Sequence, residues 1–202
     1  MHSSNPSQTL ILASTSRYRA ELLGRLGIPF QTAAPRVNEA HRDKEPPETR
    51  AARLAREKSV ALAAQFPEAV LLGSDQVASL KETPTTLFDK PGTEANAIET
   101  LLNLRGKSVH FHTALCLHHP SSARFIEHTD LTSVEVRADL TEEAIARYVH
   151  ADDPLQCAGA FKVESLGIAL FTAVRSEDPS ALIGLPLIAT ASGLRDLGFA
   201  VP

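Results

Sequence analysis

Short apolar runs and segments of helical periodicity alternate along the first part of the chain. Residues 9–13 (TLILA) form a continuous apolar run of the length of a buried strand. In residues 17–26 apolar side chains recur at helical spacing, and Gly27 follows as a stop. The pattern predicts, in chain order, a strand at 9–13, a helix at 17–26, a strand at 28–34, a helix at 48–65 opened by Pro47, and a strand at 70–72 that ends at Gly73.

The rest of the chain is patterned differently. Residues 108–117 and 125–136 alternate with period two around a turn at 120–123, which predicts a long β-hairpin. The remaining expectations are an irregular segment at 77–88, helices at 93–104 and 141–149 capped by Thr93 and Thr141, a glycine-interrupted stretch at 157–171, and a helix at 186–197 that ends at Gly198.

These elements predict an α/β fold in which a mixed sheet is flanked by helices, with two lobes and a central cleft. We expect one domain over residues 9–200, preceded by a polar, flexible tail at 1–8. The chain has 202 residues, of which 43% are hydrophobic. A chain of this length buries roughly 70% of its extended surface, so a core forms without disulfides or structural metals.

Charge and composition then narrow the class of protein. A net charge of −4 gives no broad positive field of the kind that holds nucleic-acid backbones. No apolar run approaches the ~20 residues that span a bilayer, and the first residues lack the pattern of a signal peptide. We therefore expect a cytoplasmic protein whose partners include neither nucleic acid nor membrane. Cys116 and Cys157 are isolated, which predicts buried thiols rather than a zinc or redox site.

Hydroxyl and guanidinium groups gather where the first predicted strand feeds the first predicted helix. The junction reads Ser14-Thr15-Ser16-Arg17-Tyr18-Arg19. Free amides at a helix start attract anions, and arginine offers a planar fork to phosphate oxygens, so this turn is a candidate phosphate cradle. The alternative is that a serine only caps the helix and both arginines are solvated.

A second candidate is the acidic segment Gly73-Ser74-Asp75-Gln76, which follows a predicted buried strand. At such a strand end, where α/β proteins tend to place ligands, Asp75 would bind a metal or activate water. The alternative is a turn aspartate bonded to its own backbone. Further charged candidates suit a magnesium-bound polyphosphate, although each taken singly is also an ordinary surface charge: Glu39, Lys58, Lys90, Lys162 and Glu164.

Some motifs are excluded by their context. Gly106-Lys107-Ser108 resembles the end of a P-loop, but Leu101 stands where that motif requires glycine. No third potential metal ligand stands at a suitable spacing from the histidines at 110, 112, 118 and 119. We therefore expect structural or surface roles for these histidines. The chain has neither a nucleophile elbow nor a dinucleotide-binding glycine fingerprint.

With these residues assembled, the chain resembles the Maf family of nucleoside triphosphate pyrophosphatases almost from end to end. The resemblance is carried by LILASTSRYRAELL, VNE at 37–39, ARLAREKS, LLGSDQV, Lys90-Pro91, CAGAFKVESLG and LIGLPL. It implies a bilobed α/β fold related to inosine triphosphatases and cleavage of a nucleotide between its α and β phosphates. It also implies a divalent cation, Mg²⁺ or Mn²⁺, and a homodimer.

The resemblance assigns roles residue by residue. Asp75 matches the family's proton acceptor, and Glu39 with Asp75 would hold the metal. The positions that match phosphate-binding groups are Ser14, Arg19, Lys58, Lys90 and Lys162. The chain departs from the family at Arg17, where the family usually has proline. The replacement of proline by arginine either loosens the first helical turn or adds a positive charge beside the phosphate-binding loop.

Within the family the chain resembles the subgroup that acts on 7-methyl-GTP, on the strength of Tyr18, Gln76 and Glu164. Methylation at N7 makes guanine cationic, and a cation is attracted by an aromatic face and a carboxylate. Core packing of Tyr18 is the alternative for that residue. Two other functions stay open, a pyrophosphatase for another modified or canonical nucleotide such as dTTP or UTP, and a nucleotide-binding regulator of division or septation.

Overall fold

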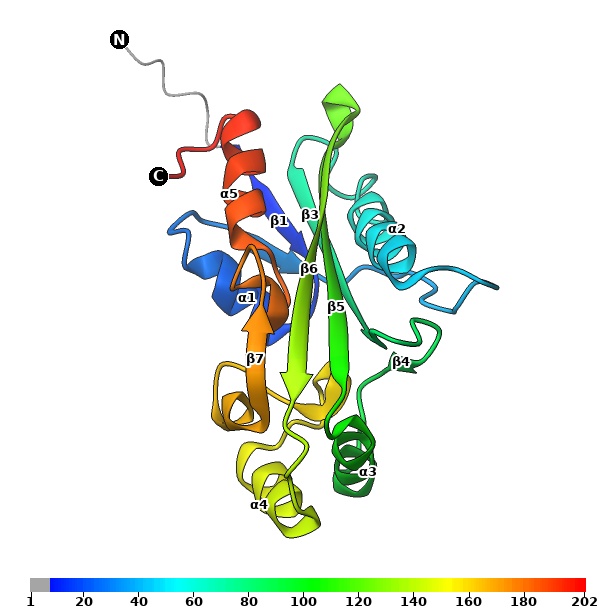
Figure 1. The fold of residues 1–202 in the computed structure, drawn as a ribbon. Coiled ribbons are helices and arrows are strands. Elements are labelled where there is room, and N and C mark those ends of the chain that lie inside the picture. The colour runs from blue at the N-terminus through cyan, green and yellow to red at the C-terminus, as the bar shows by residue number, and fades with distance from the viewer. Residues whose placement is uncertain (1–7) are drawn as a thin grey trace.

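The structure, a computed structural model, describes residues 8–202, so most of the predicted N-terminal tail lies outside the described residues. In that range seven strands form one mixed sheet (Figure 1). The strands are β1 Leu10–Ala13, β2 Gln31–Ala33, β3 Val70–Leu80, β4 Leu87–Phe88, β5 Ser108–His119, β6 Arg124–Val136 and β7 Phe171–Arg175. The helices are α1 Arg17–Gly24, α2 Pro47–Val60, α3 Glu94–Leu104, α4 Glu142–Asp152 and α5 Leu187–Asp196.

The sheet order is β2-β1-β3-β5-β6-β7, with β4 added to β3. β1 runs parallel to β2 and β3, whereas β5, β6 and β7 pair antiparallel. The predicted mixed α/β sheet and the long hairpin, now β5 and β6, are therefore confirmed. The predicted caps are also present, since the hydroxyls of Thr93 and Thr141 accept from the third amide along each helix.

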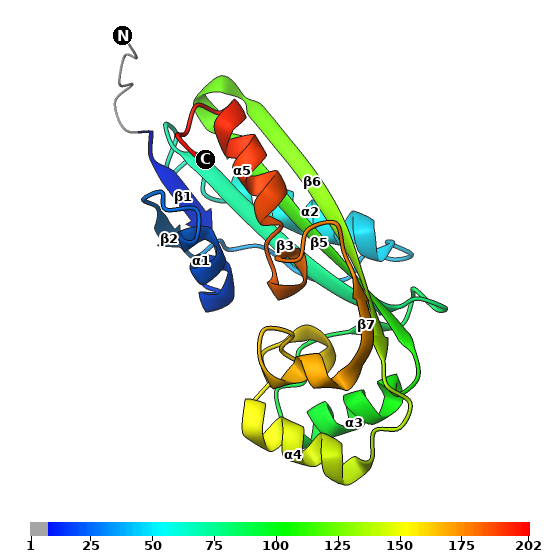
Figure 2. The same cartoon turned by 60° about the vertical axis from the view of Figure 1, so that its left-hand side comes forward.

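Helices cover both faces of the sheet, because successive side chains of its strands point to opposite faces and are buried on both. Leu10 and Leu12 of β1 pack in one cluster with residues of α1 and α5. Ile11 and Ala13, one position out of phase, pack on the opposite face beside the end of α2. Figure 2 shows α1 and α5 on the near side of the long strands and α2 behind them.

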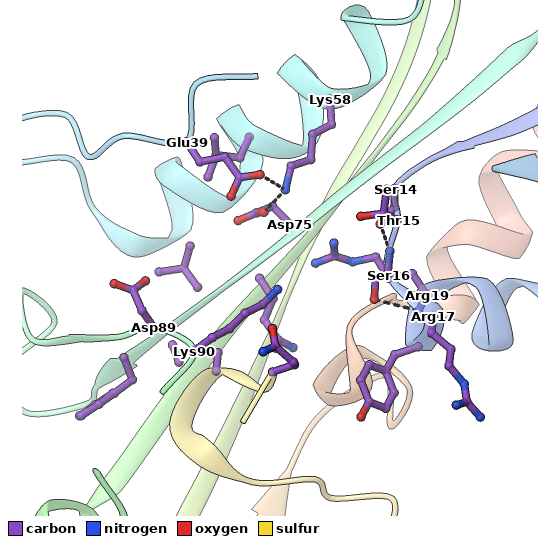
Figure 3. Close-up of a pocket in the computed structure, with 18 of the residues that line it drawn as sticks. Ser14, Thr15, Ser16, Arg17, Arg19, Glu39, Lys58, Asp75, Asp89 and Lys90 are labelled. Atoms are coloured by element: carbon purple, nitrogen blue, oxygen red, sulfur yellow. Dashed lines mark hydrogen bonds and ion pairs between the residues drawn. The ribbon is translucent and has the colours of Figure 1, made fainter. Parts of the chain in front are cut away.

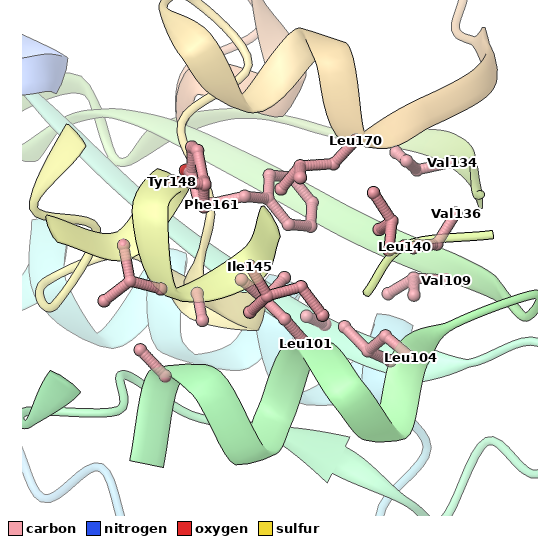
Figure 4. Packing of buried hydrophobic residues seen from close by; sticks show 14 of the residues in the cluster. Leu101, Leu104, Val109, Val134, Val136, Leu140, Ile145, Tyr148, Phe161 and Leu170 are labelled. Atoms are coloured by element: carbon pink, nitrogen blue, oxygen red, sulfur yellow. The ribbon is translucent and has the colours of Figure 1, made fainter. Parts of the chain in front are cut away.

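A further apolar cluster forms at the other end of the long hairpin. There α3 and α4 pack with the ends of β5 and β6 (Figure 4). Phe161 stacks edge-on against Phe111 and Phe171, with ring centroids 5.3 and 4.6 Å apart. The chain returns from this cluster through β7, so β3, β5 and β6 connect the two packed regions.

The largest difference from the sequence expectation is β3. The predicted strand ends at Gly73 and is followed by an irregular segment at 77–88, but the observed strand continues unbroken to Leu80. Its polar middle pairs with β5, Asp75 opposite Ala114 and Gln76 opposite Thr113. Because β5 supplies a continuous ladder, tertiary pairing overrides the low strand preference of glycine, serine and aspartate.

Candidate active site

A cleft of about 1060 Å³ opens beside the middle of β3. β1 pairs with β3 only as far as Leu72, and β4 pairs with it only from Ala78. Between these points, in the part of the chain that the structure describes, residues 73–77 have a strand neighbour on the β5 side alone. The cleft occupies this gap in the sheet, and all ten of the site residues named from the sequence line it.

The junction between β1 and α1 forms one wall of the cleft. Ser14 is buried and its hydroxyl accepts from the Ser16 amide at 3.1 Å. Ser16 caps α1, accepting from the Arg19 amide, which explains why a helix begins directly after the strand. Arg19 donates through Nε to the carbonyl of Gly184 at 3.0 Å. Burial lowers the pKa of Arg19 despite the nearby carboxylates of Asp75 and Glu39.

Asp75 lies in the middle of a strand rather than at its end, so the predicted location is wrong, as is the turn alternative. Lys58 of α2 reaches between two carboxylates, with Nζ 2.6 Å from Asp75 Oδ1 and 2.9 Å from Glu39 Oε1 (Figure 3). The Lys58 and Asp75 side chains are only 9% and 10% exposed, so their pairing is shielded from water. Burial alone raises the pKa of Glu39, but Lys58, Arg19 and Lys90 outweigh it, and that pKa lies below its ordinary value.

Gly73 allows this pairing. A Cβ at Gly73 would lie 2.0 Å from the carbonyl oxygen of Ala55 and 2.8 Å from the amide of Ser59, both in α2. The absence of a side chain at Gly73 therefore lets the helix approach the strand closely. Since residues 73 and 75 share a face of β3, the same close approach brings Lys58 to Asp75.

The opposite face of β3 is held by the turn Ala181–Ile183 and by Gly184. Ser74 donates to the carbonyl of Gly184 at 3.1 Å, the acceptor that Arg19 also uses. The amide nitrogen of Gln76 donates to the carbonyls of Ala181 and Leu182, both at 3.1 Å. Two carbonyl oxygens can be contacted favourably only by a donor, so the side-chain NH2 group of Gln76 must face them. The side-chain oxygen of Gln76 is then the atom left for a ligand.

A buried carboxylate fixes the segment Ala181–Ile183. Asp178, 4% exposed, accepts from the amides of Ser180 and Ile188 at 2.9 and 2.7 Å and from the Ser180 hydroxyl. Its own amide donates to Asp130, which is also buried. Asp178 thus positions the carbonyls that hold Gln76, Ser74 and Arg19.

A smaller pocket of about 120 Å³ adjoins the cleft and contains the predicted specificity residues. Tyr18 is half-buried there, lining both cavities rather than packing in a core cluster as the alternative expected. The thiol of Cys157 lies 4.0 Å from its hydroxyl. Burial, with Cys157 and Glu164 adding to it, raises the pKa of Tyr18 to about 12. Glu164 is exposed at the rim.

The remaining predicted residues lie at the edges of the cleft. Lys90 is exposed and lines both cavities. Lys162 also lines the cleft, but its ammonium donates to the carbonyl of Asp152 at the end of α4. Arg17 pairs with Glu21 on the surface at 2.6 Å, so the residue that replaces the usual proline adds a charge that is already paired. Of the two cysteines, only Cys116 is fully buried as predicted.

The donor set fits a small divalent cation. Two carboxylates from different elements, Glu39 and Asp75, face a single point, which in this structure is taken by the ammonium of Lys58. Mg²⁺ is typically held by one or two carboxylates together with water and substrate phosphates. Among residues 8–202 there is no group of three or more histidine, cysteine, aspartate or glutamate side chains arranged for a metal.

The loop that carries Glu39 is tied to α2 by ion pairs. Arg53 donates through Nε and Nη2 to the two carboxylate oxygens of Glu45 at 2.5 and 2.7 Å, and both side chains are largely buried. Arg50, 9% exposed, donates through Nη2 to the Glu39 carbonyl at 3.3 Å and also lines the cleft. Sequence reasoning missed Arg50, although Arg50, Leu54 and Lys58 share one helix face at a spacing of four.

Fold and site together define a class, namely an α/β protein whose cleft joins basic and hydroxyl side chains to a buried carboxylate and lysine pair. The sequence profile of the family described as Maf-like protein matches residues 9–197. The chain belongs to this family. In the described residues no helix is long and apolar enough to cross a membrane.

Relatives of known name agree over nearly the whole chain. A 7-methyl-GTP pyrophosphatase from Xanthomonas axonopodis pv. citri is 51% identical over 193 residues, covering 96% of this chain and 98% of the relative. A 7-methyl-GTP pyrophosphatase from Saccharophagus degradans is 42% identical over 196 residues, covering 97% and 98%. Among solved structures, the Staphylococcus aureus Ham1 protein matches with a TM-score of 0.47 and 15% identity over 65% of this chain and 73% of that one.

Proposed function

We propose that this protein hydrolyses 7-methyl-GTP to 7-methyl-GMP and pyrophosphate and so removes the modified nucleotide from the cellular pool. The observation that carries the proposal is the joining, in one cleft, of the Lys58–Asp75 pair with a hydroxyl-rich helix start and with the adjoining pocket that Tyr18 of the same helix lines. The two 7-methyl-GTP pyrophosphatases named above support the choice of nucleotide, because they match over almost their full length.

Asp75 acts as proton acceptor. Lys58 binds Oδ1 at 2.6 Å, so among the described residues the second oxygen is left to receive a proton from water. The water oxygen adds to the α-phosphorus, its proton passes to Asp75, and the bond from the α-phosphorus to the bridging oxygen breaks. Pyrophosphate then leaves with the electron pair of that bond.

Cations around the cleft meet the charge that develops on the phosphates. Arg19 and Ser14 would contact phosphate oxygens from the β1–α1 wall, while Lys90 and Lys162 would do so from the rim. Lys58 holds Asp75 in this structure and would reach the phosphates once the cation takes its place between Glu39 and Asp75. Mg²⁺ or Mn²⁺, held by Glu39 and Asp75, would neutralise phosphate charge when bound.

The pocket around Tyr18 suits a cationic purine. Methylated guanine carries a positive charge, which the aromatic face of Tyr18 and the carboxylate of Glu164 attract. Glu164 can also accept two hydrogen bonds from the guanine edge, and the free side-chain oxygen of Gln76 adds another acceptor. A pyrimidine carbonyl placed against these acceptors would leave them unpaired, which disfavours UTP and dTTP.

A substrate panel tests the proposal directly. Purified protein is incubated with Mg²⁺ and 7-methyl-GTP, GTP, UTP or dTTP, and the released pyrophosphate and phosphate are measured separately. We expect pyrophosphate from 7-methyl-GTP, and loss of turnover in an Asp75→Asn variant that still folds. Pyrophosphate from the pyrimidines instead would overturn the base assignment. No release from any nucleotide would favour the regulator of division.

Glu164→Gln tests the base pocket separately. The change should lower the ratio of kcat/KM for 7-methyl-GTP over UTP by about tenfold, because it removes the charge and one of the two acceptors. An unchanged ratio would place base selection elsewhere. The family resemblance further supports a cytoplasmic homodimer, without nucleic-acid or membrane partners, as the acting form. Light scattering at working concentration measures the oligomeric state.

A further inference from the structure

Arg50 is the one strongly buried cation of the cleft that the proposed mechanism leaves without a task, among the residues that the structure describes. It is 9% exposed, it lies in the first turn of α2, and it lines the cleft together with Leu54 and Lys58. Its Nη1 is 2.7 Å from Nε2 of His41, and its Nη2 makes a long, 3.3 Å bond to the carbonyl of Glu39. Its Nε is buried and has no hydrogen-bond partner.

This environment is an unfavourable one for a guanidinium. Among residues 8–202 no carboxylate lies within ion-pairing distance of Arg50, whereas the neighbouring Arg53 pairs with two and Arg56 with one. A buried charge without a counter-ion is costly, and so is a buried donor without an acceptor. The first turn of a helix also disfavours a cation, because it is the positive end of the helix dipole.

The free positions lie on one edge of the side chain. Nε and Nη2 form the edge with which arginine binds two oxygens of one phosphate or carboxylate group side by side. Here the first of these donors is unpartnered and the second is weakly held. Arg50 already lines the cleft, and rotation about its flexible stem would turn that edge toward it.

We propose that Arg50 binds the pyrophosphate portion of the substrate, as a specific anion subsite at the start of α2. This rests on the proposed function, since it takes a polyphosphate as the ligand. The terminal phosphates supply the missing counter-charge and the missing acceptors at once. Arg50 acts on the leaving group, whereas Asp75, the proton acceptor, lies on β3 and is paired with Lys58, two turns further along α2.

Calorimetric titration with inorganic pyrophosphate, at a fixed Mg²⁺ concentration, tests the subsite without any turnover. Arg50→Met should weaken pyrophosphate binding about tenfold or more, since it removes a charge-assisted bidentate contact, and it should leave the affinity for a nucleoside monophosphate unchanged. Arg56→Met is the matched control, because it removes one positive charge from the same helix at a residue paired with Glu127 outside the cleft. Its pyrophosphate affinity should equal that of the wild type.

His41→Ala separates binding from a structural role. If Arg50 only fastened the loop through His41, removing His41 would weaken pyrophosphate binding as much as Arg50→Met does, and the proposal would be overturned. We expect undiminished binding in His41→Ala, because the guanidinium is then freer to turn. Equal pyrophosphate affinity in Arg50→Met and wild type, or no pyrophosphate binding by the wild type, also overturns it. Failure of the proposed function is recognised separately, by the absence of 7-methyl-GTP turnover in the wild type.

Discussion

The contact between α2 and β3 at Gly73 offers a sharp test of how the fold produces the site. Replacing Gly73 by alanine adds a single carbon atom on the buried face of β3. That carbon would stand 2.0 Å from the carbonyl oxygen of Ala55, whereas ordinary contacts begin at 3.4 Å. Both partners are backbone atoms of regular elements, so no side chain can rotate away, and helix and strand must move apart.

The size of the effect follows from this geometry. The helix must shift by about 1.4 Å, which carries Lys58 away from Asp75, to which it is bonded at 2.6 Å. A misplacement of about 1 Å in a catalytic group costs on the order of 100-fold in rate, and overpacking a core costs about 1–3 kcal/mol of stability. Gly73→Ala should therefore lower kcat for 7-methyl-GTP about 100-fold while the protein still folds.

The assay compares pyrophosphate release and guanidinium unfolding for Gly73→Ala and for Gly24→Ala. Gly24 lies in α1, and a Cβ there meets nothing within 4 Å, so the same chemical change should leave the rate unchanged and stability equal or slightly higher. Wild-type rate and stability in Gly73→Ala would refute the reasoning. A loss of stability without a loss of rate would show that the spacing of helix and strand does not control Asp75.

Three further predictions concern groups outside the direct contact of Lys58 with Asp75. Asp178→Asn places an amide donor against the N–H and O–H groups that now donate to the carboxylate, so the free energy of unfolding should fall by about 2 kcal/mol or more. Asp196→Asn, on the surface, is the control and should leave that free energy unchanged. Equal losses in both variants would contradict this prediction. The hydrogen bonds of Arg53 hold the pKa of Glu45 below its ordinary value; the stability from this pair is therefore complete above the unfolded pKa of 4.5 and is lost as pH falls through the folded value. Glu45→Gln should thus be less stable than wild type at pH 7, with a gap that narrows below pH ~4.5, and a gap independent of pH would contradict the assignment. Burial raises the pKa of Tyr18 to about 12 and raises that of the chain's other tyrosine as well, so absorbance at ~295 nm should show almost no phenolate at pH ~10.5, where an ordinary tyrosine is mostly ionised.

Local signals were sufficient for much of the fold. The threonine caps of α3 and α4 and the alternation of the β5–β6 hairpin are encoded within a few residues, and the structure confirms them. The sequence predicts a helix start at the serine-rich junction for the same reason, and Ser16 is its cap. Helices α1 and α2 end at Gly24 and Val60, before the predicted ends at 26 and 65, because apolar residues continue into the turns that follow.

The continuation of β3 could not be read from its own residues. Gly73, Ser74 and Asp75 are poor strand formers, and turn residues in this order ordinarily end a strand. What keeps them extended is the ladder to β5, a distant partner in the sequence that pairs with β3 from Leu71 to Leu80. Arg50 was missed for a related reason: its burial depends on the loop and the sheet that close over α2, not on its neighbours in sequence.

The strand conformation of this polar stretch also explains how one short segment serves two purposes. Successive side chains in a strand point to opposite faces, so Gly73 and Asp75 face α2 while Ser74 and Gln76 face the turn that Asp178 holds. In a flexible turn, by contrast, Asp75 and Gln76 would have no fixed relation to each other. The ladder to β5 fixes the positions of Asp75 and Gln76. The group proposed to accept the proton and a group proposed to recognise the base are therefore held at a constant spacing. The rigidity that pre-organised catalysis requires is thus supplied by pairing that the local sequence by itself disfavours.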